Sequence, residues 1–112
     1  MGKTAVFVIS TIQRLSLAEA DLSKDHVAVL VLAHTRELAY QIKMEYDRFV
    51  KYFPFKVAVF FGGDAIQNNI KTLKEEKPTI VVSTPGRMFD LVNRGEIDLS
   101  QLKVFVIDES FC

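Results

Sequence analysis

The chain has 112 residues, of which 49% are hydrophobic, and this is enough apolar material for one core and one domain. Fourteen basic residues balance fourteen acidic ones, which excludes binding to nucleic acid through a strong overall positive charge. The single cysteine, Cys112, cannot form an internal disulfide and has no zinc-type spacing with His26 and His34, so we expect a reducing intracellular setting and no structural metal.

The chain opens with Gly2-Lys3-Thr4, ahead of a stretch from Ala5 to Leu15 that predicts a helix. In such a triplet the glycine admits phosphate oxygens to backbone N–H groups, the lysine meets the β/γ charge of ATP, and the threonine hydroxyl coordinates a metal. By itself the triplet also fits a solvated N-terminus or the start of a secretory signal, but Gln13-Arg14 ends the apolar run early. No run is long enough to span a membrane.

The middle of the chain alternates strand patterns with helix patterns. Val27 to Leu32 is a continuous apolar run, typical of a strand buried on both faces of a parallel sheet. Thr35 is a cap for a helix from Arg36 to Tyr52, which Pro54 closes. The remaining predicted elements are a strand at Lys56–Phe61, a helix at Ala65–Leu73, a strand at Thr79–Ser83, a helix from Thr84 through Val92, and a strand at Leu102–Ile107. We expect Gln67, Asn68 and Asn69 on the outer side of their helix.

This alternation predicts an α/β fold, in which a three-layer parallel sheet has helices on both faces and right-handed crossovers. Ligand sites in such folds lie beyond the carboxyl ends of the strands. The last strand runs into Asp108-Glu109, where one carboxylate can hold Mg²⁺, directly or through water, and the second can orient an attacking water. A charged strand end is the alternative for this pair alone. Combined with Gly2-Lys3-Thr4, it predicts two halves of an ATP site.

The other turns at the predicted carboxyl edge suit phosphate binding. In Thr84-Pro85-Gly86-Arg87 the threonine can cap, the proline presets the first turn, the glycine clears the approach and the arginine faces the ligand. Thr35-Arg36 repeats the pattern, so two helix N-termini can follow successive phosphates without reading bases. Alternatively, each feature is ordinary: a cap, a turn at Gly62-Gly63, or a surface pair between Arg36 and either Glu37 or a neighbouring acid.

These turns resemble the motifs of DEAD-box ATP-dependent RNA helicases over essentially the whole chain. His34 to Ala39 resembles motif Ia, Thr84 to Arg87 resembles motif Ib, Gly62-Gly63 resembles the intervening glycine motif, and Val106 to Glu109 resembles motif II. His34 and the stretch Tyr46–Gly63 are similar to the mRNA-splicing and mRNA-export branch, whose motif II reads Asp-Glu-Cys-Asp. The resemblance implies that residues 1–112 form part of an N-terminal P-loop RecA-like domain that is truncated at both ends.

The resemblance also implies roles for particular residues. It places Gly2, Lys3 and Thr4 on ATP, Thr4 and Asp108 on Mg²⁺, and Glu109 on the attacking water, with Lys3, Asp108 and Glu109 as the catalytic groups. Contacts to the RNA sugar-phosphate backbone fall on Thr35, Arg36, Gly63, Thr84, Gly86 and Arg87. As partners it implies RNA and proteins of the spliceosome and of mRNA export, in the nucleus and with no membrane.

Two departures from the family pattern limit the expected activity. Ser110-Phe111-Cys112 follows Glu109, so phenylalanine stands at the second acidic position of motif II. The adenine-reading segment, the Ser-Ala-Thr motif and the second domain with its arginine fingers are not in the sequence, and such a finger is worth orders of magnitude in rate. We therefore expect these 112 residues by themselves to bind ATP weakly or not at all, and neither to hydrolyse it nor to unwind RNA. A partial gene product or a truncated gene model would explain the tail.

Two other classes of protein remain open at this stage. One is a different RecA-like translocase or DNA helicase, which shares Gly-Lys-Thr and Asp-Glu but does not ordinarily carry both Thr-Arg-Glu-Leu-Ala and Thr-Pro-Gly-Arg. The other is a non-catalytic fragment that binds RNA weakly through Thr35, Arg36 and Arg87 or binds a protein through a sheet edge. Dependence of RNA binding on ATP and Mg²⁺ separates a helicase core from such a fragment.

Overall fold

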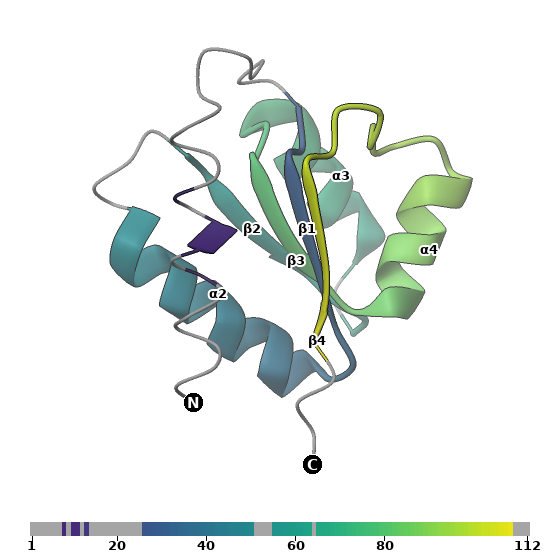
Figure 1. Cartoon of the computed structure of the whole chain (residues 1–112). Helices are drawn as coiled ribbons and strands as arrows, with labels where there is room; N and C mark the ends of the chain where they lie inside the picture. Colours follow the sequence, from purple (N-terminus) through teal and green to yellow (C-terminus); the bar gives the residue numbers. More distant parts are fainter. Residues whose placement is uncertain are drawn as a thin grey trace.

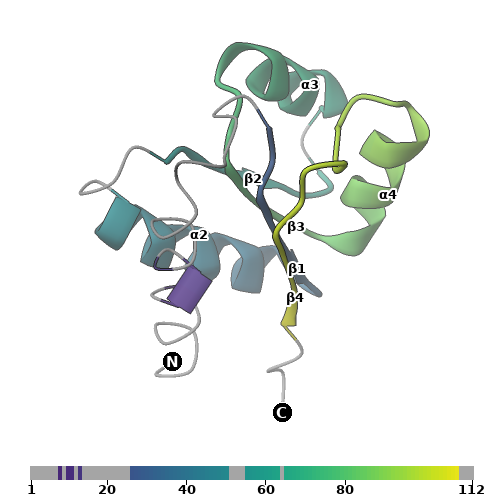
Figure 2. The ribbon, with the colours of Figure 1, turned by 45° about the horizontal axis from the view of Figure 1, so that its top comes forward.

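A computed structural model describes residues 8, 10, 11, 13, 26–50, 55–63 and 65–108 of the chain. Its strands are β1 (Val29–Ala33), β2 (Val57–Phe60), β3 (Ile80–Ser83) and β4 (Val104–Asp108). Within the described ranges they form a parallel four-stranded sheet in the order β2-β3-β1-β4. Helices cover both faces (Figures 1 and 2), which confirms the predicted three-layer α/β architecture.

The register brings the carboxyl ends of the strands to one edge of the sheet. Ser83 at the end of β3 pairs with Phe60 on β2 and with Leu32 on β1, while Ala33 pairs with Asp108 on β4. Because all four strands run in the same direction and end at nearly the same level, the turns that follow them lie side by side (Figure 1). The turns singled out in the sequence therefore share one edge.

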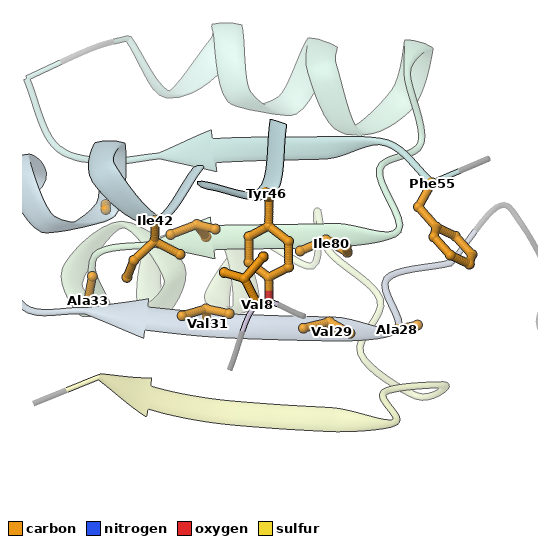
Figure 3. Close-up of a cluster of buried hydrophobic side chains, with 11 residues drawn as sticks. Val8, Ala28, Val29, Val31, Ala33, Ile42, Tyr46, Phe55 and Ile80 are labelled. Carbon is orange, nitrogen blue, oxygen red and sulfur yellow. The ribbon is translucent and has the colours of Figure 1, made fainter. Parts of the chain in front are cut away.

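Helix α2 (Arg36–Val50) covers one face of the sheet. Alternate residues of the strands point to this face, so Val29 and Val31 of β1 pack with Ile42 of α2 and Ile80 of β3 in the same buried cluster. Figure 3 shows the ring of Tyr46 among these aliphatic side chains. The regular recurrence of apolar residues along α2 thus has its expected function, which is to bury one stripe of the helix against the sheet.

Helices α3 (Ile66–Glu75) and α4 (Pro85–Asn93) lie on the opposite face (Figure 2). Leu30 and Val81, which alternate with the residues of the first cluster, pack here with Ile70 of α3 and Leu91 of α4. The continuous apolar runs of β1 and β3 are explained by this arrangement, because both strands are central and both of their faces are covered.

The first predicted helix, Ala5–Leu15, lies mostly outside the described residues. Val8, Ser10, Thr11 and Gln13 have helical backbone, with Val8 and Thr11 buried and the other two exposed. The Thr11 hydroxyl donates to the carbonyl of Val8 at 2.9 Å and lies 2.7 Å from the Tyr46 hydroxyl. Since Thr11 has one hydroxyl hydrogen and directs it to Val8, the Tyr46 hydroxyl donates to Thr11. This bond joins the first segment to α2.

The predicted boundaries agree with the observed ones to within two residues wherever the structure describes them, and the start of α2 at Arg36 and the end of β3 at Ser83 are as predicted. Strand β1 starts at Val29 rather than Val27, and β4 covers Val104–Asp108 rather than Leu102–Ile107. The predicted extension of α2 to Tyr52 falls outside the described residues. Among those described, no helix combines the length and the apolar character needed to cross a membrane.

One expectation about α3 is wrong. Asn69 does not lie on the outer side of the helix but is buried, with 4% of its surface exposed, while Gln67 and Asn68 are exposed as predicted. Asn69 is adjacent to the buried Ile70 and three positions after Ile66, which also packs toward the core. Its place in the helical period therefore puts it at the interface with α4, and its polar character does not decide its direction.

Candidate nucleic-acid interface at the carboxyl edge of the sheet

The carboxyl edge carries the turns in the same order as the strands. Gly62-Gly63 follows β2, Thr84 follows β3, Thr35 follows β1, and Asp108 ends β4. The turn after β3 thus lies between the turn after β2 and the turn after β1. The backbone of Asp108 lies next to the end of β1, just before the start of α2. This arrangement brings the described candidate residues for RNA together and puts the candidate metal ligand at one end of their row.

Thr35 caps α2 as the sequence predicts. Its side-chain oxygen accepts a hydrogen bond from the backbone N–H of Leu38 at 3.0 Å, and its carbonyl accepts one from Ala39 at 3.0 Å. These bonds fix the first turn of α2 and use one of the N–H groups that a helix start leaves without a partner. The cap therefore fixes the backbone from which the side chain of Arg36, the first residue of α2, extends.

Arg36 is held against the glycine turn that follows β2. The carbon of its guanidinium group lies 5.2 Å from the centroid of the Phe61 ring, a cation–π distance. Gly63 has φ of +96°, and a Cβ added there would lie 3.0 Å from Nη1 of Arg36. Gly63 is thus required both for its backbone conformation and for the room that it leaves to Arg36.

The surface pair between Arg36 and Glu37, which was the ordinary alternative for this arginine, is not present. The ion pairs found in the described part of the chain join His26 to Asp98, Lys43 to Asp47 and Arg48 to Glu45. A shallow hollow of about 230 Å³, open to solvent, lies against Arg36 and is lined by Glu37, Tyr40 and Phe61. The Arg36 guanidinium therefore faces an accessible surface with its positive charge not neutralised by a described carboxylate.

Thr84 differs from Thr35, and the expectation that its side chain caps the helix is wrong. It precedes α4 with extended backbone, φ −77° and ψ 149°, and its hydroxyl makes no capping hydrogen bond among the described residues. Its carbonyl instead accepts from the N–H of Met88 at 3.1 Å and from the hydroxyl of Ser83 at 2.9 Å. Pro85 occupies the first turn, as predicted, where the lack of an N–H costs nothing.

Gly86 and Arg87 complete the start of α4. A Cβ added to Gly86 would meet no atom within 4 Å, so this glycine borders open space, in agreement with the prediction that it clears an approach. The guanidinium of Arg87 donates from Nη1 to Oδ1 of Asn69 at 2.8 Å. Arg87 is half-buried beside the buried amide, whereas Arg36 is exposed.

The candidate ATP residues are only partly described. The backbone of Asp108 ends β4 at the carboxyl edge, where the fold is expected to bind ligands. A carboxylate is the type of oxygen donor that Mg²⁺ prefers. Gly2, Lys3, Thr4 and Glu109 lie outside the described residues, and the described ones include no cluster of three or more His, Cys, Asp or Glu residues suited to a metal.

The parallel α/β fold is consistent with a partial RecA-like helicase domain, and comparison with known proteins identifies the family. The sequence profile of the DEAD/DEAH box helicase family matches residues 1–110, so the chain belongs to this family. This match argues against the alternative of another RecA-like translocase or DNA helicase, and the resemblance seen in motifs Ia, Ib and II is confirmed at the level of the family.

Curated relatives agree with this assignment. The chain is 56% identical over 110 residues to ATP-dependent RNA helicase WM6 of Drosophila melanogaster, and the alignment covers 97% of the chain and 25% of that protein. It is 53% identical over 112 residues to ATP-dependent RNA helicase SUB2 of Scheffersomyces stipitis, with coverage of 97% and 25%. Identity to ATP-dependent RNA helicase sub2 of Aspergillus terreus is 52%, with coverage of 97% and 24%. The chain spans about a quarter of the length of these relatives.

Two residues of this edge were not identified from the sequence. Phe61 was predicted only as the last residue of a strand, and Asn69 was placed on the outer side of its helix, yet they contact Arg36 and Arg87 respectively. The helical period of Ile66, Ile70 and Leu73 was an available signal that position 69 borders a buried stripe. No local signal marks Phe61, because its contact with Arg36 joins two turns that are far apart in the sequence.

Proposed function

We propose that the chain is part of the first RecA-like domain of an ATP-dependent RNA helicase, and that its carboxyl edge binds the sugar-phosphate backbone of RNA. The contacts are assigned to Thr35, Arg36, Gly63, Thr84, Gly86 and Arg87. Two helix N-termini, each with a hydroxyl and a guanidinium group, attract phosphate through their N–H groups and positive charge. Such contacts hold RNA without selecting its sequence.

The observation that carries this proposal is the alignment of the three turns on neighbouring strands. The turn after β3 lies between the turns after β2 and β1, and Arg36 bridges the outer two by packing on Phe61 and over Gly63. An RNA backbone that crosses this row meets Arg36 and Arg87 in succession. The open space at Gly86 allows the backbone to come close to the start of α4.

For the nucleotide we propose that Gly2, Lys3 and Thr4 hold the phosphates of ATP. Thr4 and Asp108 would hold Mg²⁺, which stabilises charge on the transferred phosphoryl group. Glu109 follows Asp108 directly and would orient the attacking water. The backbone of Asp108 pairs with Ala33, three residues before Arg36, and this pairing supports a link between the two proposed sites.

The function of the whole protein is inferred from its relatives, which are named as ATP-dependent RNA helicases. We propose that the whole protein clamps and bends RNA between two RecA-like domains when ATP closes the cleft, and that hydrolysis resets it. The similarity of His34 and Tyr46–Gly63 to the splicing and export branch supports action on messenger RNA in the nucleus, with spliceosome and export proteins as partners.

The test is binding of a fluorescent single-stranded RNA to the 112-residue chain as a function of salt. Arg36→Gln and Arg87→Gln should each weaken binding and lower the slope of log affinity against log salt by about 0.7, the value for one phosphate contact with a single strand. Arg94→Gln is the matched control, because Arg94 is exposed at the C-terminal end of α4. Equal losses in all three variants, or none, would overturn the proposal.

The same titration distinguishes a helicase core from a non-catalytic RNA-binding fragment. RNA affinity that rises in Mg²⁺-ATP, and fails to rise after Lys3→Ala, supports coupling between the two sites. RNA affinity that is unchanged by nucleotide supports the fragment, for which Arg36 and Arg87 bind RNA while the nucleotide residues do not contribute.

A further inference from the structure

Asn69 is a buried polar side chain whose place in the fold calls for an explanation. Only 4% of its surface is exposed, and it lies on the side of α3 that also buries Ile70. Burying an amide costs free energy unless its polar atoms find partners. Its Oδ1 accepts a hydrogen bond from Nη1 of Arg87 at 2.8 Å, and the guanidinium charge strengthens this bond.

The bond joins helices α3 and α4 through two residues that are 18 positions apart in the sequence. Helix α3 comes after the turn Gly62-Gly63, and α4 starts directly after Thr84, so Asn69 and Arg87 connect the elements behind two neighbouring turns of the carboxyl edge. An arginine side chain has many rotamers, and a fixed acceptor restricts them. A buried acceptor on another helix is well suited to this purpose, because it does not move with solvent-exposed side chains.

The chemistry of the amide is also informative. The amide oxygen of asparagine is a hydrogen-bond acceptor, and its bond to Arg87 orients the guanidinium group. A guanidinium group has five N–H donors in a fixed plane, and fixing Nη1 therefore fixes the direction of all of them. Arg87 thus differs from Arg36, which is held by an aromatic ring and by the room over a glycine.

We propose that Asn69 is a positioning residue: it holds the guanidinium group of Arg87 in the orientation that meets an RNA phosphate. This inference rests on the proposed function, because it takes Arg87 as an RNA contact. Asn69 itself does not touch RNA, since it is buried behind Arg87.

The experiment uses the full 112-residue chain and a fluorescent 15-nucleotide poly(U) RNA. Asn69→Leu keeps the branched shape of the side chain but removes the acceptor. It should weaken RNA binding about fivefold and lower the slope of log affinity against log salt by less than the value of one phosphate contact. Asn69→Asp keeps an acceptor at the same place and should bind RNA more tightly than Asn69→Leu. In a chain that already carries Arg87→Met, Asn69→Leu should cause no further loss, because the group that it positions is absent.

Urea unfolding of each variant separates positioning from general stability, since a purely structural role lowers stability without changing the salt slope of the folded protein. If Asn69→Leu does not fold, Asn69→Ala replaces it, because alanine removes the acceptor without adding bulk. Equal binding by the wild type and the folded variant that lacks the acceptor would overturn the inference, as would equal losses in Asn69→Leu and Asn69→Asp.

Failure of the inference is distinguishable from failure of the proposed function. If Arg87→Met binds RNA as the wild type does, or if the wild-type chain binds no RNA, the RNA contact at Arg87 is wrong and the inference is overturned with it. If Arg87→Met weakens binding but Asn69→Leu does not, the proposed function stands and only the positioning role of Asn69 is overturned.

Discussion

At the scale of single residues, Gly63 and Gly86 of the carboxyl edge have different structural environments. Gly63 has a left-handed backbone and lies against Arg36, whereas Gly86 is in the first turn of α4 and borders open space. A side chain at Gly63 therefore strains the backbone and displaces an arginine. A Cβ at Gly86 meets no atom of the described residues within 4 Å, so we expect it to affect what approaches from outside.

These environments predict opposite effects on stability. Gly63→Ala should lower the free energy of unfolding by about 1 kcal/mol or more, because a non-glycine residue is strained at this φ. Gly86→Ala should raise it by up to about 1 kcal/mol, because alanine restricts the unfolded chain and favours helix. Urea unfolding measures both. A loss of stability in Gly86→Ala similar to that in Gly63→Ala would contradict the described environments.

We expect RNA binding to fall in both glycine variants, although their free energies of unfolding change in opposite directions. In Gly63→Ala the new Cβ moves Arg36, whose guanidinium group is the nearest described side chain. In Gly86→Ala the Cβ occupies the approach to the start of α4. The comparison shows why a stability measurement alone does not report the function of this edge.

At the scale of elements, α2 and α4 begin with the same residue type but in different ways. The Thr35 side chain caps α2, while the Thr84 side chain does not cap α4, which relies on Pro85 and on the carbonyl of Thr84. The sequence pattern predicts a cap at both positions. The neighbouring strand β2 determines the conformation of Thr84. The Thr84 N–H donates to the carbonyl of Phe60 on β2, and Thr84 thereby continues the sheet.

This difference gives a prediction for alanine variants of the two threonines. Thr35→Ala should lower the free energy of unfolding by about 1 kcal/mol, because it removes the bond to the Leu38 N–H. Thr84→Ala should change stability by less than about 0.5 kcal/mol. Chemical unfolding of the two variants, side by side, checks this difference. Equal losses would mean that Thr84 caps α4 in solution.

Element types and approximate limits were accessible from the sequence because they depend on local patterns. The apolar run of β1 and the stripe of α2 follow directly from residue periodicity, and Pro85 marks the start of α4. Some boundaries shifted by one or two residues, because a residue beside a strand can be buried and bonded to a neighbour without belonging to the regular ladder. Ala28, for example, is buried and its N–H bonds to the carbonyl of Thr79 just before the ladder starts at Val29.

At the scale of the whole molecule, the bond between Tyr46 and Thr11 joins segments that are 35 residues apart. Burial raises the pKa of Tyr46 from 10.0 to about 12. The folded protein therefore favours the neutral phenol, while the unfolded chain ionises it near its ordinary pKa. This makes the fold sensitive to alkaline pH.

The sign of this dependence follows from the raised pKa. Stability from Tyr46 is fully present below pH 10 and is lost as pH rises from 10 to about 12, by a total of about 2 to 3 kcal/mol. Urea unfolding across this range measures it. Tyr46→Phe should lack this part of the pH dependence, and it should be less stable than the wild type at neutral pH by about 1 kcal/mol. An unchanged alkaline profile in Tyr46→Phe would rule out the assignment.

The sequence by itself determined the α/β class, the order of the elements and the turns that carry the family's motifs, because periodicity and turn chemistry act over a few neighbouring residues. Only the tertiary structure decided that Asn69 is buried against Arg87 and that Arg36 lies on Phe61 and over Gly63. The same holds for the hydrogen bond that the Tyr46 hydroxyl donates to the Thr11 hydroxyl. These contacts join segments distant in sequence, and the register of the parallel strands and the packing of helices on both faces bring them together.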